Sequence, residues 1–152
     1  MTIRRMIETE ADMLALGKRV AQKMERHGFI ALCGDLGAGK TVFARGVAEA
    51  FGIGHVSSPT FMIVCEYPTE PKLYHFDVYR LSDADELYAI GYEDYLKENA
   101  MILMEWANLV KPVLPDERLT VSIEGSGADC RTVVIEPHGA RTEELFSEDS
   151  CI

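Results

Sequence analysis

The spacing of apolar residues predicts alternating strands and helices in the first third of the chain. Residues 28–33 are an apolar run of strand length, and residues 3–7, which begin and end with isoleucine, are expected to form a short edge strand. Between them, a helical apolar stripe begins after Thr9, a residue type that caps helix N-termini, and continues to about His27. Apolar residues share one helical face again over residues 42–51. We therefore expect an edge strand, a helix, a second strand and a second helix in this order.

The remaining apolar pattern predicts two β-hairpins. Residues 61–67 and 73–79 flank a turn rich in proline and glutamate. Residues 119–123 and 131–136 alternate between apolar and polar positions and flank a turn that contains Gly-Ser-Gly. Each pair of segments is expected to fold back on itself.

Two short helices and a buried strand are expected between the hairpins. The helices are predicted over residues 83–90 and, as a helix or turn, over residues 92–97. Residues 100–104 are apolar throughout, which predicts a buried strand that ends at Glu105. Residues 107–115 are expected to be irregular because prolines bound and interrupt them.

This succession of strands and helices predicts a single α/β domain. A chain of 152 residues is long enough to bury one substantial core, and no internal repeat or linker divides it. We assign residues 1–137 to the domain. Residues 138–152 are polar and acidic, and we expect them to form a frayed C-terminal tail.

Charge and cysteine usage narrow the possible functions. The 25 acidic and 15 basic residues give a net charge of -10, which argues against a large nucleic-acid footprint of the chain's own because the basic residues are scattered. The four cysteines show no C-x-x-C spacing, and no run of 18 apolar residues exists. We expect a cytoplasmic protein that is neither secreted nor membrane-spanning.

Residues 34–41, Gly-Asp-Leu-Gly-Ala-Gly-Lys-Thr, fit the phosphate-binding loop pattern G-x-x-x-x-G-K-[ST] at every fixed position. In such a loop, glycines let backbone N–H groups point at phosphate oxygens, Lys40 reaches the β- and γ-phosphates, and the Thr41 hydroxyl ligates Mg²⁺. A glycine-rich turn that binds nothing is the alternative. The predicted strand before the loop and helix after it favour nucleoside triphosphate binding.

Glu105 is the candidate for the second acidic group that a phosphate loop needs to hold Mg²⁺ or its water ligands. It follows four apolar residues, so it lies at the C-terminal end of a predicted buried strand. The longer glutamate side chain favours contact with the metal through water or orientation of the attacking water. An ordinary acidic residue that closes a strand is the alternative reading.

A second polar group lies in residues 75–80, His-Phe-Asp-Val-Tyr-Arg. Strand alternation places His75, Asp77 and Tyr79 on one face. Asp77 is a candidate to hold Mg²⁺, order the water nucleophile or pair with Lys40, and Arg80 is a candidate to stabilise transferred charge. The alternative is a hydrogen-bonded core network with Arg80 in an external ion pair.

Two further residues have less specific signals. Thr60 follows Ser-Ser-Pro, at a place where nucleotide hydrolases often keep a γ-phosphate sensor, and a plain turn is an equal alternative. Trp106 either stacks on a base or, as we favour, packs on the core. The sequence lacks the Asn/Thr-Lys-x-Asp string that reads guanine, so adenine is favoured.

Taken together, these motifs resemble the TsaE family of bacterial ATPases, which are required for threonylcarbamoyladenosine at position 37 of tRNA. The resemblance rests on the octet at residues 34–41, Ser-Pro-Thr-Phe at 58–61, the His-x-Asp-x-Tyr-Arg string at 75–80 and Glu-Trp at 105–106. It covers roughly residues 10–125. The octet alone occurs in many NTPases, whereas the combination is specific.

The resemblance implies a single-domain P-loop NTPase with a mixed central β-sheet flanked by helices. It also implies ATP and Mg²⁺ as cofactors, slow hydrolysis by the isolated protein, and activation by a TsaB–TsaD heterodimer through which tRNA is served indirectly. Carried over by motif, the catalytic candidates are Lys40, Thr60, Asp77 and Glu105, and the metal candidates are Thr41 and Glu105. The cofactor-binding candidates are Leu36, Gly37, Ala38, Gly39, Lys40, Thr41 and, near the adenine, Glu10 or its neighbour Thr9. Contacts from residues 129–131 are not expected, because the C-terminal hairpin matches the family weakly.

Two other functions fit the same loop. A small-molecule kinase would transfer the γ-phosphate to a metabolite hydroxyl, although the sequence lacks an evident arginine-rich lid. A nucleotide-dependent binding switch would have negligible turnover.

Overall fold

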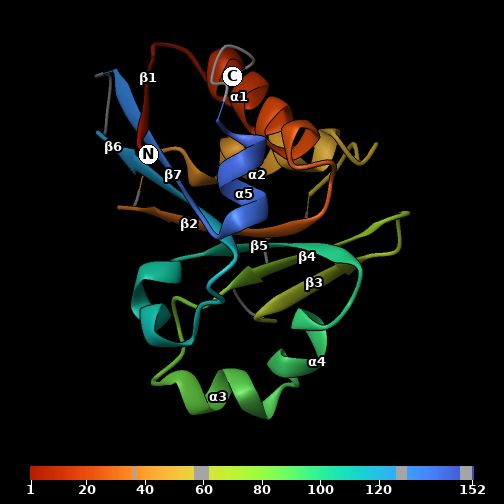
Figure 1. Cartoon of the computed structure of the whole chain (residues 1–152). Coiled ribbons are helices and arrows are strands. Elements are labelled where there is room, and N and C mark those ends of the chain that lie inside the picture. Colours follow the sequence, from red (N-terminus) through yellow and green to blue (C-terminus); the bar gives the residue numbers. More distant parts are fainter. Residues whose placement is uncertain (36, 57–61, 126–129, 148–151) are drawn as a thin grey trace.

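A seven-stranded mixed sheet forms the centre of the molecule. The structure is a computed structural model and describes residues 1–35, 37–56, 62–125, 130–147 and 152. The strands are β1 (Ile3–Ile7), β2 (Gly28–Gly34), β3 (Val64–Tyr67), β4 (Lys72–Asp77), β5 (Ala100–Glu105), β6 (Arg118–Glu124) and β7 (Arg131–His138). They are hydrogen-bonded in the order β1-β7-β6-β2-β5-β4-β3 (Figure 1). The predicted α/β fold with a mixed sheet is confirmed.

The four central strands are parallel. β2 pairs in parallel with both β5 and β6, and β4 pairs in parallel with β5. The two predicted hairpins, β3–β4 and β6–β7, are antiparallel, and β1 pairs antiparallel with β7. The C-terminal ends of β2, β4, β5 and β6 consequently meet at one edge of the sheet, which is where open α/β sheets bind ligands.

Helices cover both faces of the sheet (Figure 1). On one face lie α1 (Glu10–Lys23), α2 (Lys40–Glu49) and α5 (Ala140–Leu145), and on the other lie α3 (Ala84–Ala89), α4 (Tyr92–Leu96) and the 3₁₀ helix η2 (Ala107–Val113). All four predicted helices are present. Among the described residues, no helix combines the length and the apolar character needed to cross a bilayer.

One predicted helix end and one predicted irregular segment are wrong. α1 ends at Lys23 and not near His27, because Glu25 and Arg26 take left-handed backbone conformations with φ of 58° and 55°. Residues 107–113, expected to be irregular, form η2, which is kinked at Val110 and contains Pro112 in its second part. A short 3₁₀ segment tolerates a proline at a position where its missing N–H is not needed. Such a segment is also too short to show a recognisable spacing of apolar residues in the sequence.

Strand alternation divides the buried side chains into two cores. Ile30 and Leu32 of β2 belong to the core under α1 and α2, whereas Phe29 and Ala31 belong to the core that α3, α4 and η2 cover. All six residues of β5 are buried, as expected for a parallel strand between two helical layers. The predicted strand over residues 100–104 is confirmed.

Two glycines set the close approach of α1 and α2. A Cβ atom on Gly17 would overlap the backbone carbonyl of Phe43, and one on Gly46 would overlap the backbone carbonyl of Leu14. The two helix backbones therefore pack almost directly against each other. This contact fixes the orientation of α2, whose first residue is Lys40.

The segment from residue 138 onwards, expected to be a frayed polar tail, contains a docked helix. The N-terminus of α5 is held by the Glu117 carboxylate, which accepts hydrogen bonds from the backbone N–H groups of Arg141 and Thr142 at 3.3 and 2.7 Å. The Arg141 guanidinium donates to the carbonyls of Met24 and His27 at the end of α1, and Phe146 is fully buried. These partners are distant in sequence, so the local polar composition conceals them.

Candidate functional site

The octet at residues 34–41, called the glycine loop from here on, connects β2 directly to α2. β2 ends at Gly34 and α2 begins at Lys40, so the predicted order of strand, loop and helix is confirmed. Gly37 and Gly39 have φ of 79° and 111°, conformations that L side chains rarely adopt. The predicted phosphate contact Leu36 lies outside the described residues.

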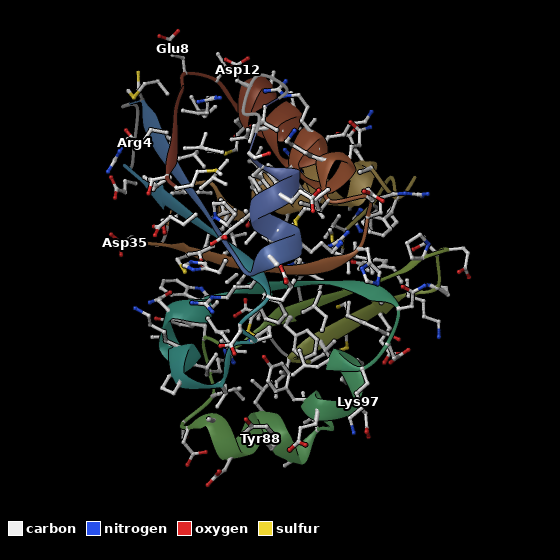
Figure 2. The ribbon with its side chains drawn as sticks, in the orientation of Figure 1. Arg4, Glu8, Asp12, Asp35, Tyr88 and Lys97 are labelled. Carbon is white, nitrogen blue, oxygen red and sulfur yellow. The ribbon has the colours of Figure 1, made fainter. Side chains whose placement is uncertain are left out.

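The mouth of the glycine loop is at the C-terminal edge of the sheet. Figure 2 shows the exposed Asp35 side chain at the outer end of β2. Thr41, the predicted metal ligand, is exposed in the first turn of α2. The N–H groups in the first turn of a helix lack intrahelical partners, so this end of α2 offers hydrogen-bond donors and positive potential to an anion.

Lys40 is the buried cation of the site. Its Nζ atom donates hydrogen bonds to the carbonyls of Gly34 and Asp35 at 2.5 and 2.8 Å, and only 6% of the residue is exposed. The same atom lies 4.0 Å from the centroid of the Trp106 ring, within range of a cation–π interaction. Burial lowers the pKa of the Lys40 ammonium, and the negative charges of Glu105 and Asp35 oppose that shift.

Two predicted carboxylates lie side by side at the ends of neighbouring strands. Asp77 of β4 is in register with Glu105 of β5, and the two strands are parallel. Glu105 shares its strand face with Leu103, which packs in the core under α1 and α2, so its side chain points toward the helix that begins at Lys40. The negative charges of both carboxylates act on the Lys40 ammonium.

His75 completes a buried pair with Glu105. The His75 Nε2 atom lies 2.6 Å from Glu105 Oε2, and the exposed fractions of the two side chains are 4% and 10%. His75 lies on the same face of β4 as Leu73, as the predicted alternation requires. The alternation does not extend to Tyr79, because β4 ends at Asp77.

Beyond β4, the chain turns outward and brings Tyr79 to Trp106. The Asp77 carboxylate accepts a hydrogen bond from the backbone N–H of Tyr79 at 3.0 Å, which closes this turn. Tyr79 is 48% exposed, and its ring lies 4.7 Å from the Trp106 ring. Trp106 therefore packs between Lys40 and Tyr79.

Arg80 is exposed, and its predicted role in charge stabilisation stays a prediction.

A cavity of about 340 Å³ adjoins the outer side of the glycine loop. Its lining includes the predicted residue Glu10 and is formed by Ile7, Glu8, Thr9, Glu10, Met13, Gly37, Ala38, Gly39, Val42 and Arg131. Figure 2 shows Glu8 on the turn after β1 and Asp12 beside the first turn of α1. The cavity joins the start of α1 to the loop, as a site for a nucleoside attached to phosphates would require.

Arg131 is a residue of this site that the sequence reasoning missed. It begins β7, and its guanidinium donates hydrogen bonds to the backbone carbonyls of Ala38 and Gly37 at 3.0 and 3.2 Å. Contacts from residues 129–131 were not expected, so the position of Arg131 is a correction. Only the pairing of β7 with β6, itself beside β2, brings Arg131 to the loop.

The oxygen-bearing side chains at the start of α2 and at the ends of β4 and β5 suit a hard cation. Thr41 offers a hydroxyl, and Glu105 and Asp77 offer carboxylates. Within the described parts of the chain, no group of three or more His, Cys, Asp or Glu residues forms a complete metal cage. A cation held here would therefore take part of its coordination from a bound phosphate and water, as Mg²⁺ does. Thr60, predicted to sense a phosphate, lies outside the described residues.

Comparisons with known proteins agree with this arrangement. A family model described as "Threonylcarbamoyl adenosine biosynthesis protein TsaE" matches residues 7–133. The chain is 41% identical over 136 residues to the tRNA threonylcarbamoyladenosine biosynthesis protein TsaE of Bacillus subtilis (strain 168), covering 88% of this chain and 85% of the relative. The corresponding protein of Haemophilus influenzae is 39% identical over 125 residues, covering 78% and 79% of the two chains.

The fold agrees with a solved relative over nearly its whole length. The crystal structure of YdiB from Bacillus subtilis superimposes with a TM-score of 0.81 at 34% identity, covering 97% of this chain and 93% of the other. The family match runs from the end of β1 to the beginning of β7, so it includes the glycine loop and the ends of β4 and β5. The chain belongs to the TsaE family of threonylcarbamoyl adenosine biosynthesis proteins.

Proposed function

We propose that this chain binds ATP with Mg²⁺ and hydrolyses it in support of threonylcarbamoyladenosine formation at position 37 of tRNA. The observation that carries the proposal is the convergence of three parts at one sheet edge. These are the glycine loop after β2, the buried Lys40 ammonium, and the carboxylates of Glu105 and Asp77 at the ends of β5 and β4. Family membership supports the biosynthetic role.

The proposed site residues have separate roles in binding the phosphates, the metal ion and the adenosine. Backbone N–H groups of residues 36–41 and the Lys40 ammonium bind the phosphates. Thr41 and Glu105 would hold Mg²⁺ directly or through water, and the ion would supply positive charge to the phosphates. Glu10 lies in the cavity beside the loop and is the proposed contact for the adenosine.

Asp77 and Thr60 are the proposed partners of the reacting phosphate. The Asp77 carboxylate lies next to Glu105 and is half-buried, so it can orient a water molecule for in-line attack on the γ-phosphate. The Lys40 ammonium stabilises the charge that develops on the phosphate oxygens. The Thr60 hydroxyl is proposed to sense the γ-phosphate.

A TsaB–TsaD heterodimer is the proposed partner. We propose that the chain acts on tRNA indirectly, through that complex. We also propose that the protein acts in the cytoplasm. Cys33, Cys65 and Cys130 form no disulfide among the described residues, which accords with a reducing compartment. The proposal for the partner rests on family membership.

One set of assays tests the proposed function. ATP hydrolysis is measured for the protein alone, with purified TsaB–TsaD, and with added tRNA. We expect weak turnover alone and acceleration by the heterodimer. ADP formation coupled to a phosphorylated metabolite would instead identify a kinase. ATP binding without turnover under all three conditions would identify a nucleotide-dependent switch.

A further inference from the structure

His75 is a buried polar side chain in an otherwise apolar part of the sheet. It is 3% exposed, and its neighbours across the sheet are Cys65 of β3 and Leu103 of β5. Burying an imidazole without a hydrogen-bond partner costs about 1–3 kcal/mol. The Nε2 atom of His75 avoids this cost through its 2.6 Å hydrogen bond to Glu105 Oε2. An apolar residue would fill the same position without needing a partner.

The hydrogen bond fixes the Glu105 carboxylate. A free glutamate side chain has several rotamers, and a catalytic carboxylate has to be held close to its productive geometry. Within the described parts of the chain, Glu105 accepts its side-chain hydrogen bond from His75 alone. The bond occupies Oε2, so it determines the direction in which Oε1 is presented at the strand end.

We propose that His75 is a positioning residue that orients the Glu105 carboxylate toward the Mg²⁺ and water of the ATP site. The inference rests on the proposed function. In this role the Nε2–H of His75 is the donor and the Glu105 carboxylate is the acceptor, and His75 does not touch the nucleotide. Partners of this kind typically contribute about 10–100-fold to metal affinity or activity.

A matched pair on the same strand provides the control. Tyr74 follows Leu73 on the opposite face of β4, is 2% exposed, and donates a 2.6 Å hydrogen bond to the Glu98 carboxylate. Tyr74→Phe therefore removes an equally short hydrogen bond between a buried β4 side chain and a carboxylate, although Glu98 is exposed and Tyr74 belongs to the core covered by α3 and α4. A loss caused only by a weaker sheet would appear in both variants.

The test compares His75→Leu, His75→Gln and Tyr74→Phe with the wild type. Three quantities are measured: kcat with TsaB–TsaD, the Kd for ATP in EDTA, and the Kd of Mn²⁺ for the ADP complex by electron paramagnetic resonance. We expect His75→Leu to lower kcat and weaken Mn²⁺ binding about 10–100-fold, with the Kd for ATP in EDTA within about twofold. His75→Gln, which retains a donor, should recover part of both losses, and Tyr74→Phe should match the wild type.

A double-mutant cycle tests whether His75 acts through Glu105. In a Glu105→Ala background, His75→Leu should have no further effect on kcat or Mn²⁺ binding. Wild-type values for His75→Leu, or full additivity in the cycle, would overturn the inference. If His75→Leu does not fold, His75→Phe, which also lacks a donor, takes its place, and wild-type Mn²⁺ affinity and kcat in that variant would also overturn the inference. Wild-type protein that fails to bind ATP would instead reject the proposed function.

Discussion

At the scale of single residues, Lys40 is held by contacts that direct its charge to the mouth of the glycine loop. Its ammonium group combines two backbone carbonyls with the face of Trp106, in a region where burial lowers its pKa. Burial is unfavourable for an unpaired ammonium, so a phosphate group at the loop would be a strong additional partner. The position of Lys40 is consequently expected to matter more for ligand binding than for folding.

We predict that Lys40→Ala abolishes tRNA modification in a complementation assay and weakens ATP binding at least tenfold. The change removes the cation that contacts the β- and γ-phosphates in the proposed site. Lys18→Ala is the control, because it makes the same change in net charge at an exposed position of α1. Normal modification by the Lys40 variant would contradict the site assignment.

Glu105→Ala is expected to reduce turnover more than affinity. Backbone N–H groups of the glycine loop and Lys40 would still bind the phosphates, whereas the group that positions the metal or water would be lost. The expected decrease in kcat is about tenfold or more, with a smaller change in the Kd for ATP. Parallel measurement of both constants checks this split, and an unchanged kcat would remove Glu105 from the mechanism.

Site residues that belong to a motif of fixed spacing could be predicted from the sequence. Contacts that form only when distant strands pair could not. Lys40 and Thr41 follow from the octet, and Glu105 follows from its place after an apolar strand. Arg131 reaches the loop only through the pairing of β7 with β6 and has no local signal. The bond from His75 to Glu105 depends on a parallel register between two strands, which alternation along one strand cannot reveal.

At the scale of elements, the contact between α1 and α2 should be sensitive to added volume. We predict that Gly46→Ala destabilises the protein by about 1–3 kcal/mol, because its Cβ atom would overlap the Leu14 carbonyl. Helix propensity alone would favour alanine by about 1 kcal/mol, so the sign of the change identifies the steric effect. Chemical denaturation measures it. Gly54→Ala is the control, since nothing lies within 4 Å of its added Cβ.

The Glu117 carboxylate couples the docking of α5 to pH. Burial opposes ionisation of Glu117, but hydrogen bonds from Thr142 and Arg141 outweigh it and lower the pKa. A carboxyl whose folded pKa is lowered stabilises the protein above its unfolded pKa of about 4.3, and this stability is lost as the pH falls through the folded pKa. The stabilisation should therefore be complete at neutral pH and absent in strong acid.

Glu117→Gln tests this coupling. We expect the variant to be less stable than the wild type by about 1 kcal/mol at pH 7, the usual cost of losing a helix N-terminal cap. The difference in unfolding free energy should shrink as the pH falls below about 4.3. Glu143→Gln, at an exposed position of the same helix, should show no such pH-dependent difference. A constant difference across the pH range would contradict the assignment.

Most element types were predictable because the period of apolar residues is visible within each segment. Several element ends, by contrast, depend on contacts with residues distant in sequence. The cap at Thr9 was recognisable, and its hydroxyl accepts the N–H of Asp12 at 3.1 Å. The docking of α5 was not recognisable, because Glu117 lies more than 20 residues before the helix that it caps. The left-handed residues that end α1 carry no glycine signal.

At the scale of the whole molecule, the negative net charge bears on whether the isolated chain can bind tRNA. The net charge is -10, with 15 basic residues among 152. A protein that neutralises several phosphates releases counterions, and that release drives binding. Without a basic cluster, the isolated chain lacks this driving force, so the proposed TsaB–TsaD partner should supply most of the tRNA-binding surface.

We predict that the isolated protein binds tRNA with a Kd above about 10 μM at physiological salt, within the range of weak non-specific binding. Fluorescence anisotropy with labelled tRNA, at about 50 and 200 mM salt, measures both affinity and its salt dependence. A chain that contacted six to ten phosphates would lose about 10³–10⁵ in affinity between these concentrations. The same titration with TsaB–TsaD, with and without this protein, separates the contributions of the partners. Tight, salt-sensitive binding by the isolated chain would place the tRNA surface on this protein and would contradict the division of roles.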